Sequence, residues 1–227
     1  MALIDEIDSS CKLYIPAWHY GNEQQKAIDL SGNDNHGLIY GAKIGPTFTF
    51  LAKNWGYGYY FNGKSDYIRI KDDVSLRPNN LTIMLWFMLL TFERDMCLLS
   101  KITLPAGPGW IIQHYTTQKR RIQVYFYNGD TFTAYLLTSS YLELNKWYNV
   151  CVTHNGSEAK LYLNGKLESS DSDTTLDHSD HDLYIGCMDG QYRFANAIIG
   201  EVRLYSRVLS DSEIKEKYDV MKKLFCC

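Results

Sequence analysis

The sequence of 227 residues carries a formal net charge of −3, and 45% of it is hydrophobic, as in ordinary folded proteins. A chain without a large basic patch is not expected to bind nucleic acid, and no apolar run is long enough to insert into a membrane. The first residues lack a basic start followed by an apolar run, so we expect no secretory signal peptide in this chain.

Short apolar or alternating runs, each bounded by turn-forming residues, follow a polar segment that we expect to be an N-terminal arm, residues 1–10. Runs of this kind are typical of β-strands. They predict strands at residues 11–18, 38–40, 48–50, 58–63, 66–70, 81–90, 97–101, 109–115, 121–127, 132–138, 147–154, 159–163, 182–185 and 197–205.

Two Asn-Gly pairs organise the second half of the chain. Asn155-Gly156 separates the strands at 147–154 and 159–163, and Asn164-Gly165 ends the latter. Both residue types tolerate positive φ, so the pairs predict tight hairpin turns. Two such turns nine residues apart indicate an antiparallel meander.

One segment near the C-terminus has the pattern of a helix. Ser210 and Glu213 have the spacing of a capping box, and apolar residues then recur at helical spacing. The whole pattern predicts an all-β protein, a two-sheet antiparallel sandwich with one short C-terminal helix. We expect one domain at residues 11–219 and a tail at 220–227. The side chains expected to be buried between the sheets are Phe61, Trp86, Trp147 and Val202.

Four motifs resemble, in their order along the chain, the laminin-G-like branch of the concanavalin A-like jelly rolls. They are residues 29–37 (DLSGNDNHG), 60–68 (YFNGKSDYI), the pair 147–150 (WYNV) and 161–165 (LYLNG), and 200–210 (GEVRLYSRVLS). The resemblance implies one convex and one concave sheet. Members of the family include lectins, pentraxins, adhesion modules and glycan-binding domains appended to enzymes, so the fold does not fix the function.

Many members of this family bind calcium, and the resemblance implies a site in the loop at residues 29–37, near residue 62. The candidate ligands are Asp29, Asn33, Asp34, Asn35 and Asn62. However, Asn62 and Gly200 stand where the family usually has aspartates, which would weaken the site. The alternative is that these side chains only build turns.

Aromatic side chains near turns, or in strands that could face the concave side, are candidates for stacking on sugar rings. These candidates are Trp55, Trp110, Tyr115, Tyr125, Tyr127 and Tyr192. The alternative for each is an ordinary place in the core.

Catalysis receives little support from the sequence. The family's laminarinase-like glycosidases carry an E-x-D-x-x-E strand, whose carboxylates are spaced for retaining hydrolysis. The nearest match here is Glu6-Ile7-Asp8, which lies in the expected arm and has Cys11 at the third acidic position. We therefore expect a protein that is not an enzyme.

These observations predict a non-enzymatic surface module that binds carbohydrate or a surface protein, located outside the cell or on a virus or phage particle. The alternative is a structural virion subunit that uses the jelly roll for assembly with other virion proteins or with copies of itself. A glycoside hydrolase is a third, less favoured class.

Overall fold

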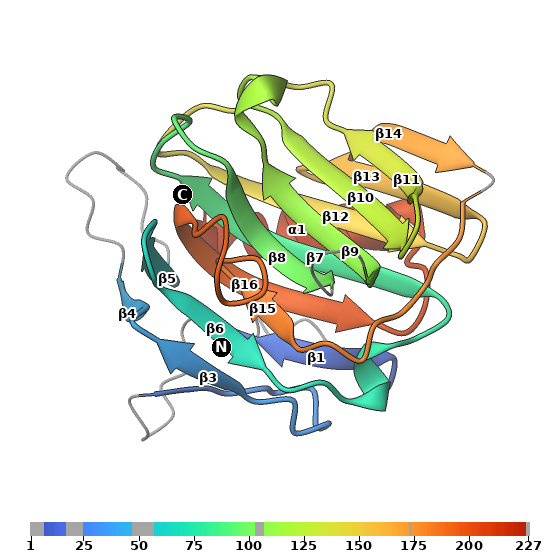
Figure 1. Cartoon of the computed structure of the whole chain (residues 1–227), viewed down its shortest axis with the longest axis horizontal. Coiled ribbons are helices and arrows are strands. Elements are labelled where there is room, and N and C mark those ends of the chain that lie inside the picture. The colour runs from blue at the N-terminus through green and yellow to red at the C-terminus, as the bar shows by residue number, and fades with distance from the viewer. Residues whose placement is uncertain (1–6, 17–24, 47–56, 103–106, 173, 226–227) are drawn as a thin grey trace.

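Strands of alternating polarity pair into two antiparallel sheets that stack face to face, with one helix outside them (Figure 1). The structure is a computed structural model, and it describes residues 7–16, 25–46, 57–102, 107–172 and 174–225. The predicted strand at residues 48–50 and the candidate Trp55 lie outside these ranges.

The sheet that carries the helix is called the back sheet. Its strands, in spatial order, are β14 (Lys166–Ser172), β13 (Glu158–Leu163), β12 (Trp147–His154), β7 (Leu81–Leu89), β16 (Asn196–Tyr205), β5 (Tyr57–Asn62) and β4 (Lys43–Pro46). The first strand of the chain, β1 (Cys11–Ile15), pairs with the end of β16. The two Asn-Gly turns join β12 to β13 and β13 to β14, so the predicted meander is confirmed.

The other sheet is called the front sheet. Its strands, in spatial order, are β11 (Phe132–Leu137), β10 (Ile122–Asn128), β9 (Pro108–His114), β8 (Met96–Ile102), β15 (Leu183–Ile185), β6 (Tyr67–Ile70), β3 (Gly37–Tyr40) and β2 (Lys26–Ala27). Two short 3₁₀ turns, η1 (Val74–Leu76) and η2 (Thr116–Gln118), lie in connections.

The main core lies between the sheets and follows from the period of two along each strand. On β12, Tyr148, Val150 and Val152 face this core. Trp147 and Cys151, at alternate positions of the same strand, face the opposite side, toward the helix. Phe61 and Val202 are also in the main core, as predicted.

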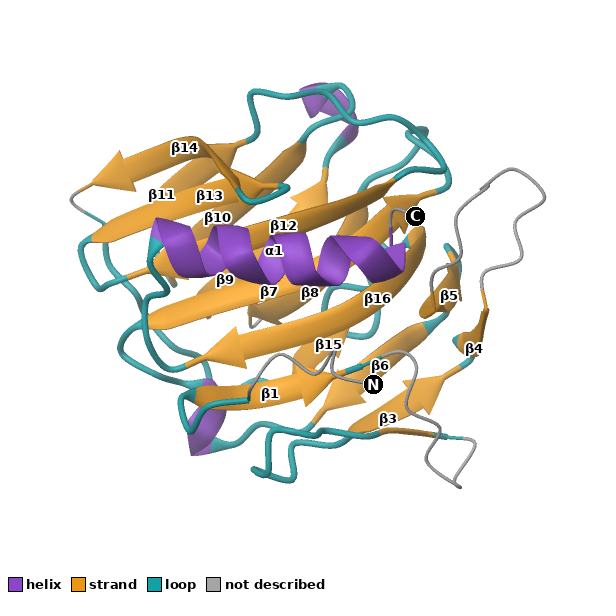
Figure 2. Ribbon diagram, turned by 180° about the vertical axis from the view of Figure 1, so that it is seen from behind, coloured by secondary structure: helices purple, strands orange, loops and turns teal. Residues whose placement is uncertain are grey.

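The helix, α1 (Asp211–Phe225), begins with the predicted capping box. The Glu213 carboxylate accepts from the Ser210 backbone amide at 2.8 Å, and the Glu213 amide donates to the Ser210 hydroxyl at 3.3 Å. Figure 2 shows α1 lying across the outer face of the back sheet. Its residues 220–225 fall where we expected a tail; the domain boundaries themselves remain a prediction.

The helix corrects one prediction about the core. Trp86 and Trp147 are buried, but under α1 on the outer face of the back sheet rather than between the sheets. Trp86 stacks on Phe225 and Tyr218 with ring centroids 4.7 and 5.5 Å apart. Trp147 packs against the same Phe225 at 4.8 Å. A period of two places a residue on a face but does not say what covers that face.

The open edges of the two sheets lie side by side where β11 approaches β14. The backbone amide of Tyr135, on the free edge of β11, donates to the Asp171 carboxylate of β14 at 3.0 Å. Thr133 likewise donates its hydroxyl to the Thr175 carbonyl at 2.9 Å. Acceptors on β14 and on the connection that follows it thus bond to the edge strand β11.

Most of the predicted strands within the described residues are confirmed to within one or two positions, although β1 is described only to Ile15. The sequence patterns missed three strands, namely β2, β4 and β14. The sequence of β14 (KLESSDS) is polar, and its residues are partly or fully exposed, so it offers no alternation to read. Within the described ranges, no helix is long and apolar enough to cross a membrane.

Candidate functional site

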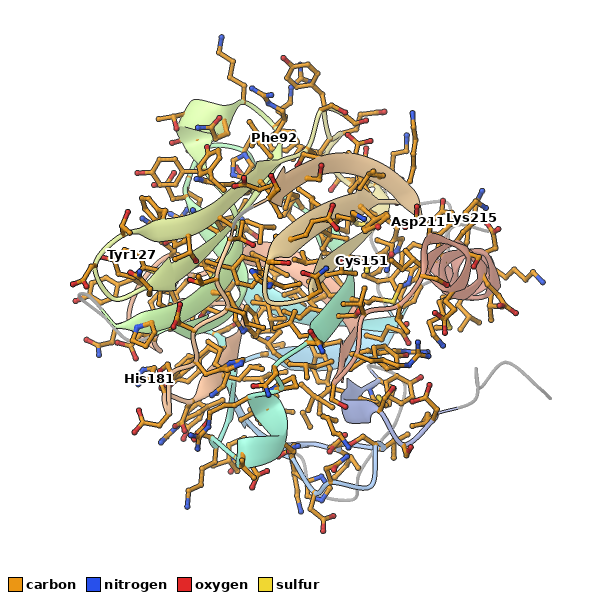
Figure 3. The ribbon with its side chains drawn as sticks, turned by 90° about the vertical axis from the view of Figure 1, so that its right-hand side faces the viewer. Phe92, Tyr127, Cys151, His181, Asp211 and Lys215 are labelled. Carbon is orange, nitrogen blue, oxygen red and sulfur yellow. The ribbon has the colours of Figure 1, made fainter. Side chains whose placement is uncertain are left out.

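The outer face of the front sheet is the face that α1 leaves uncovered. Because side chains alternate along a strand, Val124 and Phe126 of β10 point into the main core, and Tyr125 and Tyr127 point outward. Figure 3 shows Tyr127 on the side of the molecule opposite the helix residue Lys215. This outward face is the candidate site.

The loop at residues 186–195, between β15 and β16, packs on this face (Figure 1). Met188 packs with Cys97 of β8 and Ile111 of β9. The backbone fixes both ends of the loop, since the Ala195 amide donates to the Gly186 carbonyl at 2.8 Å, and the loop also accepts a bond from the Cys97 amide. The loop is therefore held against β8 and β9.

Two residues of this loop have left-handed backbone conformations that are uncommon for residues with a side chain. Asp189 has a φ of 58° and Arg193 a φ of 51°. Such conformations persist where the surroundings hold them, and they are common at functional sites. For Arg193, the surroundings are the polar groups of β9 and β10.

A chain of hydrogen bonds joins this arginine to the end of β9 and the start of β10, next to the turn between them. Arg193 Nη1 donates to Gln113 Oε1 at 2.6 Å, and Gln113 Nε2 donates to Gln123 Oε1 at 3.0 Å. The guanidinium also lies over the Tyr115 ring, 5.1 Å from its centroid. Burial raises the pKa of the Tyr125 hydroxyl, while neighbouring Arg193 opposes the increase, so Tyr125 is protonated at neutral pH.

An aromatic ledge lies beside this polar chain, on β10 and β11. It consists of Tyr125, Tyr127, Phe132 and Tyr135. The Phe132 ring packs against Tyr125 at 4.9 Å and Tyr127 at 5.5 Å between centroids. Phe132 is 59% exposed and Tyr135 is 44% exposed. Exposed rings held this firmly offer a rigid apolar surface to a ligand.

The structure brings four of the six aromatic candidates to this face. Tyr125 and Tyr127 belong to the ledge, Tyr115 contacts Arg193, and Tyr192 is 52% exposed on the loop beside it. Trp110 is a correction, because it points inward from β9, is 1% exposed and lies in the main core, out of reach of a ligand.

The sequence reasoning did not select the polar members of the site, nor Phe132 and Tyr135. The alternation that places Tyr125 outward also places Gln123 outward, and could have identified it. Tyr135 pairs directly with Tyr125 across the hairpin. Arg193 had no pattern to reveal it, since a loop from β15 brings it to β9.

The predicted calcium loop at residues 29–37 is held together by its own hydrogen bonds. The Asp29 carboxylate accepts four bonds of 2.8–2.9 Å, from the Tyr14 amide, the Asn35 amide, and the amide and hydroxyl of Ser31. The Asn33 side chain donates to the Cys11 carbonyl and the Asn35 side chain to the Lys12 carbonyl, which attaches the loop to β1. Asp34 is exposed.

The fifth predicted calcium ligand lies far from this loop, which corrects the predicted set. Asn62 pairs with Asn196 at the start of β16, whereas the loop is bonded to Cys11, which pairs with Tyr205 at the end of β16. Ten strand residues separate these ends by roughly 30 Å. In the part of the chain that the structure describes, no cluster of three His, Cys, Asp or Glu side chains could hold a metal.

A separate pocket of about 240 Å³ lies on the back sheet, where α1 begins. Its polar lining groups bind one another: the Tyr162 hydroxyl donates to Asp211 at 2.7 Å, and Lys160 pairs with Glu158 at 3.1 Å. Figure 3 shows Asp211 on the helix side, away from Tyr127. This pocket is therefore distinct from the outer face of the front sheet.

The carboxylates of Asp182 and Asp189 are already engaged. Asp182 pairs with Arg69, and Asp189 is hydrogen-bonded to the His181 ring. A retaining glycosidase instead needs two carboxyl groups facing one another across the scissile bond. Around Arg193, the described polar groups are the side-chain amides of Gln113 and Gln123, the guanidinium itself and the hydroxyl of Tyr125.

The structure is similar to several solved structures of low sequence identity, which supports the fold alone. A receptor-binding domain of botulinum neurotoxin, mosaic serotype C/D, aligns with a TM-score of 0.69 and 19% identity, covering 94% of this chain and 51% of that one. Trypanosoma rangeli sialidase, in complex with the inhibitor DANA, aligns with a TM-score of 0.67 and 16% identity, covering 91% and 32%. The chain thus spans about half the length of the toxin domain and a third of the sialidase.

No curated protein matches the sequence at a significant level. A family model does match, over residues 62–215, more than half of the chain. This range includes two of the four motifs noted in the sequence in full, and residues 62–68 of a third. The chain belongs to the concanavalin A-like lectin/glucanase superfamily.

Proposed function

We propose that this chain is a non-enzymatic module that binds a glycan, free or carried by a surface protein, on the outer face of the front sheet. The observation that carries the proposal is the hydrogen-bonded chain from Arg193 through Gln113 to Gln123, beside exposed aromatic rings. Sugars are bound by this combination, since their apolar ring faces stack on aromatics and their hydroxyls meet fixed polar groups.

The fold family and the solved structures support a binding role without fixing it. The toxin domains are described as receptor-binding domains, and the sialidase as an enzyme bound to an inhibitor. The superfamily includes both lectins and glucanases. The hydrogen-bonded amides of Gln113 and Gln123 and the Arg193 guanidinium support a binding role for this face.

A matched pair of tyrosines tests the proposal. Tyr135 is 44% exposed on the ledge, and Tyr60 is 41% exposed on β5 of the back sheet. On a glycan array, Tyr135→Ala should lose most of the signal given by the unaltered protein, whereas Tyr60→Ala should keep it. Both variants should melt within a few degrees of the unaltered chain, because surface substitutions change stability little.

A silent array, or equal losses in the two variants, would contradict the proposal. Hydrolysis of an array sugar would instead favour the glycosidase class. We also propose an extracellular or virion-surface location, where such ligands occur. Immunogold labelling of intact cells or particles from the source tests this.

An assembly role is the second candidate function. Leu38 and Tyr40 of β3 are 53% and 38% exposed, and Tyr40 stacks on Tyr67 at 4.5 Å. Such an apolar surface could bind a second copy or another virion protein. Sedimentation of the intact protein should reveal a defined oligomer that Leu38→Ser dissociates. A monomer at every concentration would exclude self-assembly, and a particle pull-down would test other virion partners.

A further inference from the structure

We infer that the ligand of this face carries a carboxylate, so that the glycan is an acidic one. This inference rests on the proposed function and concerns the same site. It follows from the direction of the hydrogen bonds, from the charges around them, and from the planar shape of the donor groups.

The hydrogen bonds of the polar chain all run in one direction. Arg193 donates to the oxygen of Gln113, and the amide nitrogen of Gln113 donates to the oxygen of Gln123. Each amide oxygen is therefore engaged, and the orientation of both amides is fixed. Among the described residues, the Gln123 Nε2 group has no acceptor, so it remains available as a donor.

Arg193 adds further donors beside this amide. A guanidinium carries five N–H groups, and its bond to Gln113 and its contact with Tyr125 use only some of them. Gln113 is 1% exposed and Gln123 8%, whereas Arg193 is half-buried, so Arg193 and Gln123 are the donors that this end of the face offers to a ligand. A ligand rich in acceptors fits this arrangement, and a negatively charged acceptor fits it best.

The neighbouring turn has the charge that such a ligand requires. Gln113 and Gln123 are paired close to the turn that joins β9 to β10, which carries Lys119, Arg120 and Arg121. Lys119 and Arg120 are both left-handed, with φ of 46° and 59°. Two adjacent left-handed residues with side chains are uncommon, which indicates that this turn is held in place by its surroundings.

One acidic group beside this turn is held to it by hydrogen bonds. The Asp95 carboxylate accepts from the backbone amide of Thr116 at 2.9 Å and from its hydroxyl at 2.8 Å. Its single negative charge offsets one of the four positive charges of Lys119, Arg120, Arg121 and Arg193. The positive charge that remains favours an anion at this end of the face.

The shape of the donors favours a carboxylate over a sulfate. A guanidinium and a primary amide are both planar, and two of their N–H groups match the two oxygens of a planar carboxylate. The exposed rings of Tyr135 and Tyr192 lie close by for a sugar ring. An acidic sugar unit satisfies both parts of the face.

The test compares acidic glycans with neutral forms of the same molecules. Oligosaccharides containing hexuronic or nonulosonic acids are immobilised both as free acids and as methyl esters. Sulfated neutral oligosaccharides are immobilised on the same array. The free acids should bind at least about tenfold more tightly than their esters, which lose a charge-assisted hydrogen bond. Binding should also weaken as sodium chloride is raised from 50 to 500 mM.

Two variants sharpen the test. Gln123→Glu keeps the oxygen that accepts from Gln113 but removes the free donor. Its affinity for the free acids should therefore fall by about tenfold or more, and its affinity for the esters should change little. Arg193→Lys keeps the charge but loses the planar fork, so it should also weaken the free acids. Lys215→Glu changes the charge by two units on exposed α1 and should have no effect on either form.

The outcomes separate the two proposals. Esters that bind as tightly as acids, or sulfated sugars that bind in preference to them, would overturn the carboxylate inference and leave the glycan-binding function standing. A protein that binds none of these glycans, neutral or acidic, would overturn both. If Gln123→Glu does not fold, the ester comparison and Arg193→Lys still decide the question.

Discussion

The two outer faces of the sandwich are covered in different ways. On the back sheet, α1 seals Trp86 and Trp147 beneath a continuous apolar surface. On the front sheet, a short loop holds a polar chain in place and leaves aromatic rings exposed around it. The comparison indicates that the outer face of the back sheet contributes to stability. The outer face of the front sheet has no apolar helix over it, so a ligand can reach its surface.

The largest expected effect concerns the face under the helix. Trp147→Ala should lower the free energy of unfolding by about 3–5 kcal/mol, because it removes a large buried aromatic and leaves a cavity beside Phe225. Tyr135→Ala on the front face is the matched comparison and should change it by less than about 0.5 kcal/mol. Urea unfolding measures both. Equal effects would show that the two faces do not differ in this way.

The second effect concerns the charges buried on the same back face. Arg203 and Glu201 are 2% and 3% exposed and pair at 3.1 Å. Glu201→Gln removes the carboxylate charge that pairs with the buried Arg203 guanidinium and should destabilise by about 3 kcal/mol. The exposed pair Lys215–Asp219 on α1 is the control, and Asp219→Asn should be close to neutral. If the two variants melt together, the burial of the first pair contributes nothing.

The third effect is a loss of stability in acid that originates between the two sheets. His154 is buried, and desolvation lowers its pKa from 6.5 to about 4. Its Nδ1 accepts from the Gly156 amide at 2.9 Å, so protonation would also break this bond. Between these pKa values the unfolded chain binds more protons, so stability falls as the pH drops from about 6.5 toward 4.

The loss from His154 should reach roughly 3 kcal/mol near pH 4. Unfolding curves between pH 7.5 and 4 measure it, and His154→Gln should flatten part of the pH dependence. Burial also lowers the pKa values of His114 and His178, so some dependence should remain. An unchanged slope in the variant would show that His154 does not titrate in this window.

The smallest effect concerns the start of the helix. Ser210→Ala removes the hydroxyl that accepts from the Glu213 amide, and should destabilise by about 1 kcal/mol. Ser170→Ala, on the exposed edge strand β14, is the control and should be neutral. Thermal melts of both variants measure the difference. If α1 unfolds at a lower temperature than the sheets, the helix unfolds independently of the sandwich.

The sequence predicts the sheets well because strand alternation and Asn-Gly turns are local properties. It predicts Trp147 as buried but not what buries it, since this depends on where α1 packs. The same limit applies to the site. Tyr125 and Tyr127 share a face by alternation alone, whereas Arg193 reaches Gln113 from 80 residues away. Trp110 fails as a candidate because one position along β9 separates the outer face from the core.

The contact between Asp171 and the edge of β11 also affects how the protein behaves at high concentration. A free strand edge offers unpaired amides, and these can recruit a strand from another molecule and start aggregation. Here the Tyr135 amide is already bonded, and a negative charge is placed along the edge. The bond and the charge therefore disfavour pairing of β11 with a strand of another chain, while the aromatic ledge on its outer face stays exposed.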